Sequence, residues 1–172
     1  MIKKVCTAFL IVIFYILQTT IFNKLQLASV SPNLLIILTF ATGFIRGKKP
    51  GVYTGVFAGL LIDCFSGGVL GFNALIYMYI GYINGVFHSV FFDDDVKLPL
   101  LLVVCSDLLH SFAYYVLRFL LRNRLNFGTY FVKVMLPEML YTLIVAIILY
   151  RFFLSLERRM DEWDRRRATN FD

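Results

Sequence analysis

The segment LPLLLVVCSDLLHSFAYYVLRFLL, residues 98–121, decides the fold class of this chain. A helix needs about 20 predominantly apolar residues to cross the hydrocarbon core of a bilayer. This segment is long enough, and its few polar residues are spaced three and four apart, which places them on one face of a helix. The segment therefore predicts a membrane-spanning helix with one polar stripe.

The composition of the rest of the chain agrees with that reading. Of the 172 residues, 59% are hydrophobic and only 16% are charged, and the mean hydropathy is +0.75. Soluble domains contain about 45–50% apolar and about 25% charged residues. A fold of this size has too little interior to hide the excess from water. We therefore expect an all-α polytopic membrane protein.

Six apolar runs are separated by short polar segments. They are Val5–Phe22, Pro32–Ile45, Gly51–Cys64, Leu70–Phe87, Leu98–Leu121 and Tyr130–Leu154. The second and third are short for a span, so they are extended by their flanks, tilted, broken or re-entrant. Pro32 suits the first turn of the second run. We expect a six-helix transmembrane domain over residues 1–154 and a cytoplasmic helical tail over residues 155–172.

Lysine and arginine residues predict the orientation of the spans. With six spans and a cytoplasmic N-terminus, 12 basic residues lie inside and 5 lie outside. Because basic residues favour the cytoplasmic side, this bias predicts that both ends are cytoplasmic. The cluster Arg118, Arg122 and Arg124 falls on the outer side against this rule, and its role stays open. Since topology accounts for most of the positive charge, we expect no nucleic-acid partner.

Ionisable residues inside the apolar runs are candidates for function, because each costs about 3 kcal/mol or more at bilayer depth. The stripe on the fifth run contains Asp107, His110 and Tyr114, and Glu138 follows Pro137 in the sixth. Asp107 and His110 are spaced to hydrogen-bond each other, and Pro137 predicts a kink. The stripe either pairs polar groups to set helix register, binds a small ligand or lipid headgroup, or contacts a partner.

Two further polar residues lie at the predicted outer face. Asp63 ends the third run, and Asn73 follows the glycine-rich segment after it. Aspartate and asparagine accept hydrogen bonds from the free N–H groups of a helix start. Capping is therefore the favoured role of both, with a ligand contact as the alternative.

Two patterns predict helix contacts. Gly51, Gly55 and Gly59 repeat at four-residue spacing, which lets another helix approach closely. This pattern is either a packing seam or a broken helix beside a ligand site, and its surface is also a candidate contact for a partner helix. In the tail, Leu156, Met160 and Trp163 continue a heptad-like seam from the sixth run, which predicts docking of a cytoplasmic partner.

Signatures of enzymes are missing from the sequence. It contains no zinc-protease HExxH, no phosphate-binding Walker loop and no GxSxG nucleophile motif. The three cysteines Cys6, Cys64 and Cys105 form no metal-binding pair. We therefore expect no enzymatic activity, no cofactor and no bound metal.

The order and spacing of several motifs resemble one family. The start of the second run, residues 31–35 (SPNLL), the segment at residues 70–75 (LGFNAL), and Asp63, Asp107 and Glu138 resemble MreD, the rod shape-determining membrane protein. The resemblance covers Met1–Leu154. It implies a multi-pass component of the bacterial cytoplasmic membrane, with a bundle similar to the S-components of energy-coupling-factor transporters. It also implies binding to MreC, and work with MreB, RodA and a class B penicillin-binding protein in lateral peptidoglycan synthesis.

Two functions from different classes therefore compete. The first is a non-enzymatic scaffold of the cell-elongation complex that supports rod shape. The second is an S-component-like binder of a vitamin or of a lipid-linked cell-wall precursor, with a cavity lined by Asp107 and His110. The sequence does not identify the surface that meets MreC or the oligomeric state.

Overall fold

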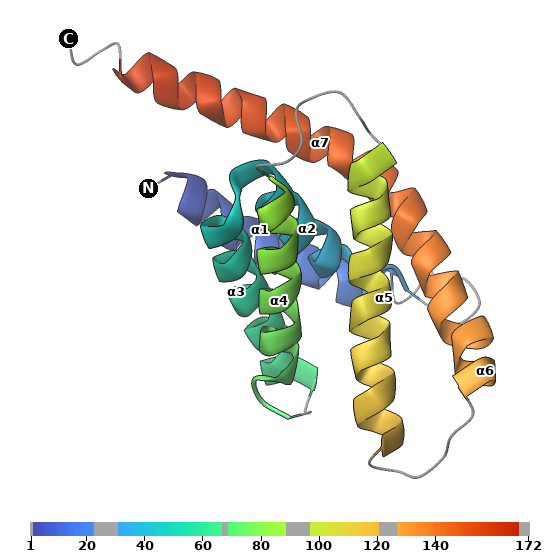
Figure 1. Ribbon diagram of the computed structural model, residues 1–172. Helices are drawn as coiled ribbons and strands as arrows, with labels where there is room; N and C mark the ends of the chain where they lie inside the picture. The colour runs from blue at the N-terminus through green and yellow to red at the C-terminus, as the bar shows by residue number, and fades with distance from the viewer. Residues whose placement is uncertain (1, 23–30, 67–68, 89–96, 121–126, 169–172) are drawn as a thin grey trace.

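Every secondary-structure element that the computed structural model describes is a helix (Figure 1). The described part of the chain is residues 2–22, 31–66, 69–88, 97–120 and 127–168. The elements, in chain order, are α1 (Ile2–Leu17), the π-helix η1 (Gln18–Phe22), α2 (Leu34–Arg46), α3 (Lys48–Ser66), α4 (Phe72–Phe87), α5 (Lys97–Leu120), α6 (Phe127–Tyr130), the π-helix η2 (Phe131–Met135) and α7 (Leu136–Ala168).

Helix α2 forms the centre of the fold. All its residues from Leu34 to Gly43 are buried, because α1, α3, α4, α5 and α7 surround it. A helix that is apolar on all sides belongs in such a core. The second run is short for a span, but because other helices enclose α2, the length of this helix need not match the thickness of the lipid.

The start of α2 differs from the prediction. Pro32 precedes the helix, and Asn33 is the N-cap, whose side chain accepts a hydrogen bond from the backbone N–H of Ile36. The prediction that Pro32 occupies the first turn is wrong. An asparagine side chain at the N-cap satisfies a free N–H group, which proline at the first helical position does not do.

Helices α3 and α4 pack more closely than any other described pair. A Cβ atom added to Gly55 would overlap the carbonyl group of Tyr77, and one added to Gly59 would overlap the backbone at Ala74. Gly51 and Gly81 face each other in the same way. The two backbones are in direct contact, and only glycine leaves room for that approach.

Helices α5 and α7 form a second, more open pair on the other side of α2 (Figure 1). The π-helix η2 runs directly into α7, and Pro137 lies in the first turn of α7. The missing N–H of proline falls where the helix changes from π to α geometry, so the irregular turn accommodates it. Helix α7 runs from Leu136 to Ala168 and passes residue 154, so most of the sixth apolar run and the described part of the tail lie on one helix.

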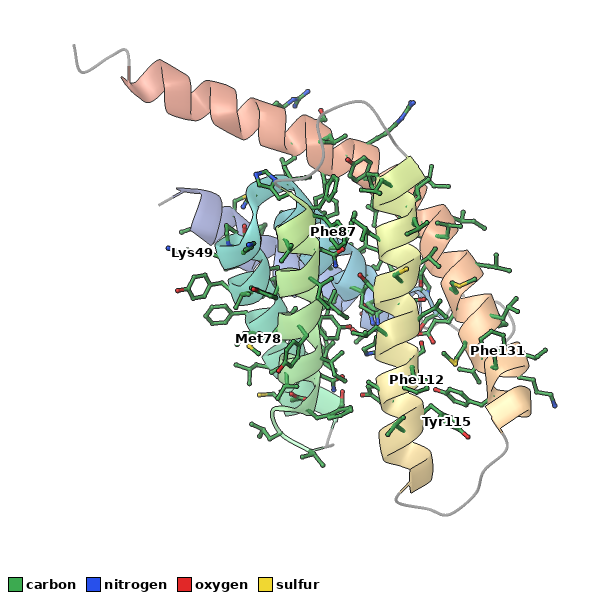
Figure 2. All side chains as sticks on the ribbon, in the orientation of Figure 1. Lys49, Met78, Phe87, Phe112, Tyr115 and Phe131 are labelled. Atoms are coloured by element: carbon green, nitrogen blue, oxygen red, sulfur yellow. The ribbon has the colours of Figure 1, made fainter. Side chains whose placement is uncertain are left out.

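Large apolar side chains cover the outside of the molecule, as Figure 2 shows along the helices. On α1, Val5, Phe9, Val12 and Ile16 form one exposed stripe, and on α7 Leu140, Ile144 and Ile148 form another. Soluble monomers rarely expose such continuous apolar surface. By length and composition, Leu98–Val116 and Phe131–Leu156 are able to cross a membrane, and Val5–Ile21 and Leu34–Arg46 are shorter apolar helices.

Candidate functional site

Asp63 lies near the end of α3, and its side chain binds the backbone at the start of α4. Its carboxylate accepts hydrogen bonds from the backbone N–H groups of Gly71 (2.9 Å), Asn73 (3.1 Å) and Ala74 (3.1 Å). It also accepts one from the Asn73 side-chain amide at 2.8 Å, and it is only 3% exposed. These groups are the free donors of a helix start, which favour a negative charge. Asp63 thus ties α3 to α4 at the end where the glycine contacts finish.

A second polar cluster lies at the start of α2, deep in the protein. The Tyr77 hydroxyl donates to the Asn33 side-chain oxygen at 2.8 Å, and the Asn33 backbone N–H donates to the Thr142 hydroxyl at 3.3 Å. Tyr77 and Thr142 are both fully buried. Three helices, α2, α4 and α7, are therefore joined through one asparagine.

His110 lies between two tyrosines at the side of this cluster. Its ring meets Tyr77 edge-to-face with the ring centres 5.5 Å apart, and the ring of Tyr114 lies at 5.0 Å. Tyr114 in turn accepts a hydrogen bond from the Asn73 amide at 3.2 Å. The stripe on α5 thus reaches from the centre of the protein to the Asp63 cap, and it faces other helices.

Two acidic residues, Asp107 on α5 and Glu138 on α7, lie where these two helices pack against each other. Glu138 accepts a hydrogen bond from the Ser111 hydroxyl at 3.2 Å. Asp107 is 1% exposed, with Glu138 and Thr142 as its polar neighbours on α7, but neither of its oxygens has a hydrogen-bond partner among the described residues.

The predicted hydrogen bond between Asp107 and His110 is not formed. Both oxygens of Asp107 and Nδ1 of His110 are buried, and no described residue forms a hydrogen bond with them. The spacing on α5 places both residues on one face, but the histidine ring packs between Tyr77 and Tyr114 toward α4, whereas the carboxyl group has its polar neighbours on α7. The prediction of this bond is therefore wrong.

Several polar residues of the interior were not singled out from the sequence. Asn33 and Tyr77 join the central cluster, and Asn84 on α4 donates to the Ser106 hydroxyl on α5 at 2.9 Å. An asparagine within an apolar run is a signal that could have identified Asn84, because a buried amide requires a partner. Tyr77 carries no such signal, since tyrosines occur throughout this chain.

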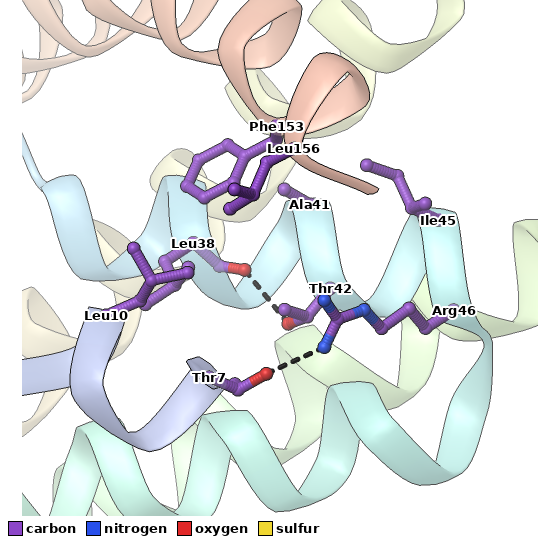
Figure 3. Close-up of a pocket in the computed structure, with 9 residues that line it drawn as sticks. All are labelled: Thr7, Leu10, Leu38, Ala41, Thr42, Ile45, Arg46, Phe153 and Leu156. Carbon is purple, nitrogen blue, oxygen red and sulfur yellow. Dashed lines mark hydrogen bonds between the residues drawn. The ribbon is translucent and has the colours of Figure 1, made fainter. Parts of the chain in front are cut away.

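A small pocket lies between α1, α2 and α7 (Figure 3). Leu38 and Phe153 form part of its wall, and the Arg46 guanidinium donates to the Thr7 hydroxyl at 2.7 Å at one side. Its volume is about 10 Å³, which is room for about one water molecule. A drug-sized ligand needs roughly 300 Å³ or more. This pocket therefore does not admit a vitamin.

The predicted helix-contact residues have different surroundings. Gly51, Gly55 and Gly59 face α4 of the same chain, which fills the space that we considered for a partner helix. Leu156 lines the pocket beside Phe153, so it faces α1 and α2. The side chains of Met160, Trp163 and Arg118 lie outside the described part, as do Arg122 and Arg124. Among the described residues, no group of three or more His, Cys, Asp or Glu side chains is arranged to hold a metal ion.

Comparison with known proteins identifies the family. No curated protein and no solved structure matches the chain significantly. The family model for the rod shape-determining protein MreD matches residues 2–160, nearly the whole chain. The matched segment includes the Asp63 cap, the close-packed α3 and α4, and the polar side chains between α5 and α7. The chain therefore belongs to the MreD family of rod shape-determining membrane proteins.

Proposed function

We propose that this protein is a non-enzymatic scaffold of the bacterial cell-elongation complex, which binds MreC in the cytoplasmic membrane and supports lateral peptidoglycan synthesis. The observation that carries the proposal is the family match over residues 2–160. MreB, RodA and a class B penicillin-binding protein are the further partners that membership implies. The protein contributes contacts between these components, and no cofactor takes part.

The distribution of polar and apolar side chains supports a scaffold. The interior is closed by glycine contacts and by hydrogen bonds between helices, while large apolar side chains point outward from α1, α3, α4, α5 and α7. Lipid contacts part of this surface, and a transmembrane helix of a partner is able to pack on the rest by van der Waals contact. The S-component-like binder lacks comparable support, because the pocket between α1, α2 and α7 has room only for about one water molecule and is not lined by Asp107 or His110.

A co-purification experiment tests the scaffold. The tagged chain is extracted with a mild detergent, and the recovery of MreC is measured for wild type and for two surface variants. One variant carries Tyr53→Ala and Phe57→Ala on α3, and the other carries Ile144→Ala and Ile148→Ala on α7; all four side chains are exposed. We expect one variant to recover at least several-fold less MreC at an unchanged level of the chain in the membrane.

Two results would contradict this proposal. The first is undiminished recovery of MreC with both variants and with their combination. The second is binding of a vitamin by the purified chain at nanomolar concentration, which would favour a transporter subunit. A matched control is Leu109→Ala on α5, an exposed leucine outside both surfaces.

We further propose six spans with both ends in the cytoplasm. The 12-to-5 distribution of basic residues supports this orientation. In addition, Thr7 near the start of α1 and Leu156 on α7 line the same pocket, so these two regions lie at one level of the bundle. A reporter active only in the periplasm should be active when fused near Asn126 and inactive when fused after Trp163; the reverse pattern would contradict the topology.

A further inference from the structure

Asp107 on α5 and Glu138 on α7 are two acidic residues that the scaffold does not use. Asp107 is 1% exposed and both its oxygens lack a hydrogen-bond partner among the described residues. Glu138 is its electrostatic neighbour and receives one hydrogen bond, from Ser111. The pair therefore differs from Asp63, whose carboxylate is surrounded by donors.

No cation among the described side chains faces this pair. The titratable groups around it are Tyr77 on α4 and His110 and Tyr114 on α5. The only charged side chain that α2 offers is Arg46, at its far end, where the guanidinium binds Thr7. The neighbours on α7 are neutral, and the nearest of them is Thr142, whose hydroxyl accepts the Asn33 N–H.

Two negative charges cannot both persist in such a place. Removing an ion from water without a counter-charge costs several kcal/mol, and two carboxylates side by side repel each other. One added proton removes one of the two charges and so lowers this cost. The buried oxygens of Asp107, which have no donor among the described residues, are atoms to which that proton is able to bind.

We propose that Asp107 and Glu138 form a proton-binding site in the membrane interior, which holds one proton at neutral pH. The proton removes one of two buried negative charges between α5 and α7, and the Ser111 hydroxyl, which donates to Glu138, orients that carboxyl group. Release of this proton would leave two adjacent charges between the helices and favour their separation. The site is thus a proton-sensitive contact between two helices of the protein.

Proton release on unfolding tests the proposal directly. The full chain in detergent micelles is unfolded at pH 7 in weakly buffered solution, and the released protons are counted with an indicator dye. In the unfolded chain both carboxyl groups are ionised. We expect wild type to release about one proton more per chain than the double variant Asp107→Asn/Glu138→Gln. Glu162→Gln in the charged tail is the matched control and should behave as wild type.

The same proton makes the stability of the wild type depend on pH. Between about pH 6 and the pH at which the folded protein releases the proton, the folded state binds one proton more than the unfolded state. The unfolding equilibrium constant should therefore rise about tenfold per pH unit more steeply in wild type than in the double variant. If the double variant does not accumulate, the infrared band of a protonated carboxyl group decides: it should be present in wild type at pH 7 and shift in Glu138→Gln.

Three results would overturn the proposal. Equal proton release from wild type and the double variant would show that the pair holds no proton. If His110→Gln, in which both carboxyl groups are intact, released no extra proton on unfolding, the proton would belong to the imidazole of His110. Stabilisation by Na⁺ relative to choline at constant pH, abolished by Asp107→Asn, would show that a metal ion occupies the site instead.

Discussion

The α3–α4 pair and the α5–α7 pair hold helices together in two different ways. Between α3 and α4 the backbones touch at Gly51, Gly55 and Gly59, and Asp63 closes the end of the contact. Between α5 and α7 the backbones stay further apart, and polar side chains such as Ser111 and Glu138 meet across the space. Small residues thus give close packing, whereas the wider interface leaves room for a polar site.

This difference matters because lipid provides no hydrophobic force between helices. Packing and hydrogen bonds must supply the association energy in a bilayer. The backbone contact between α3 and α4 leaves no space for the two helices to move relative to each other. The acidic side chains between α5 and α7, in contrast, are able to gain or lose a proton. We therefore assign the structural role to α3 and α4, and the candidate regulatory role to α5 and α7.

The largest expected effect comes from Gly55→Leu. The new side chain would overlap the Tyr77 carbonyl, which is backbone and has no other rotamer to adopt. We expect a destabilisation of about 3 kcal/mol or more and a strong decrease of the protein in the membrane, measured by immunoblot. Gly128→Ala is the control, because a Cβ atom there meets nothing within 4 Å. A normal membrane level of Gly55→Leu would show that α3 and α4 are not in close contact.

A smaller effect is expected from Asp63→Leu. The substitution removes the acceptor of hydrogen bonds from Gly71, Asn73 and Ala74 and leaves buried donors unsatisfied. The expected cost is about 2–3 kcal/mol, measured by thermal unfolding in detergent. Asp63→Asn should lose less than Asp63→Leu, because the amide oxygen still accepts, and Ser66→Ala, at an exposed position, should lose little.

The smallest effect on stability is expected from Asp107→Leu, although it replaces the same residue type by leucine as Asp63→Leu does. The oxygens of Asp107 have no hydrogen-bond partner among the described residues, so leucine of similar size removes a buried polar group without breaking a hydrogen bond. We expect a change below about 1 kcal/mol in the same unfolding experiment. A loss as large as that of Asp63→Leu would show that Asp107 has a structural partner, and would remove the contrast between the two interfaces.

Much of this fold was predictable because apolar runs of the right length become helices in lipid. The elements α3, α4 and α5 fall within a few residues of the predicted runs. The boundaries differed where local hydrogen bonding decided them, as at Asn33, which begins α2 after Pro32. The π-helices η1 and η2 had no signature that the apolar pattern could reveal.

The sequence predicted which residues belong to the candidate site but not what those residues contact. The rarity of ionisable residues in apolar runs singled out Asp63, Asp107, His110 and Glu138, because each is costly in lipid. Their partners were less accessible to sequence reasoning. Asp107 and His110 share a helix face but have different neighbours, because α7 faces one of them and α4 the other.

The sequence by itself determined the helical membrane architecture and the family, since both depend on composition, run length and the order of motifs along the chain. Only the tertiary structure decided what each special residue contacts. The glycines of α3 meet α4, Asp63 caps a helix, and the oxygens of Asp107 have no hydrogen-bond partner in the described part of the chain. The physical reason is that spacing sets the face of a helix, whereas the packing of other helices decides what that face meets.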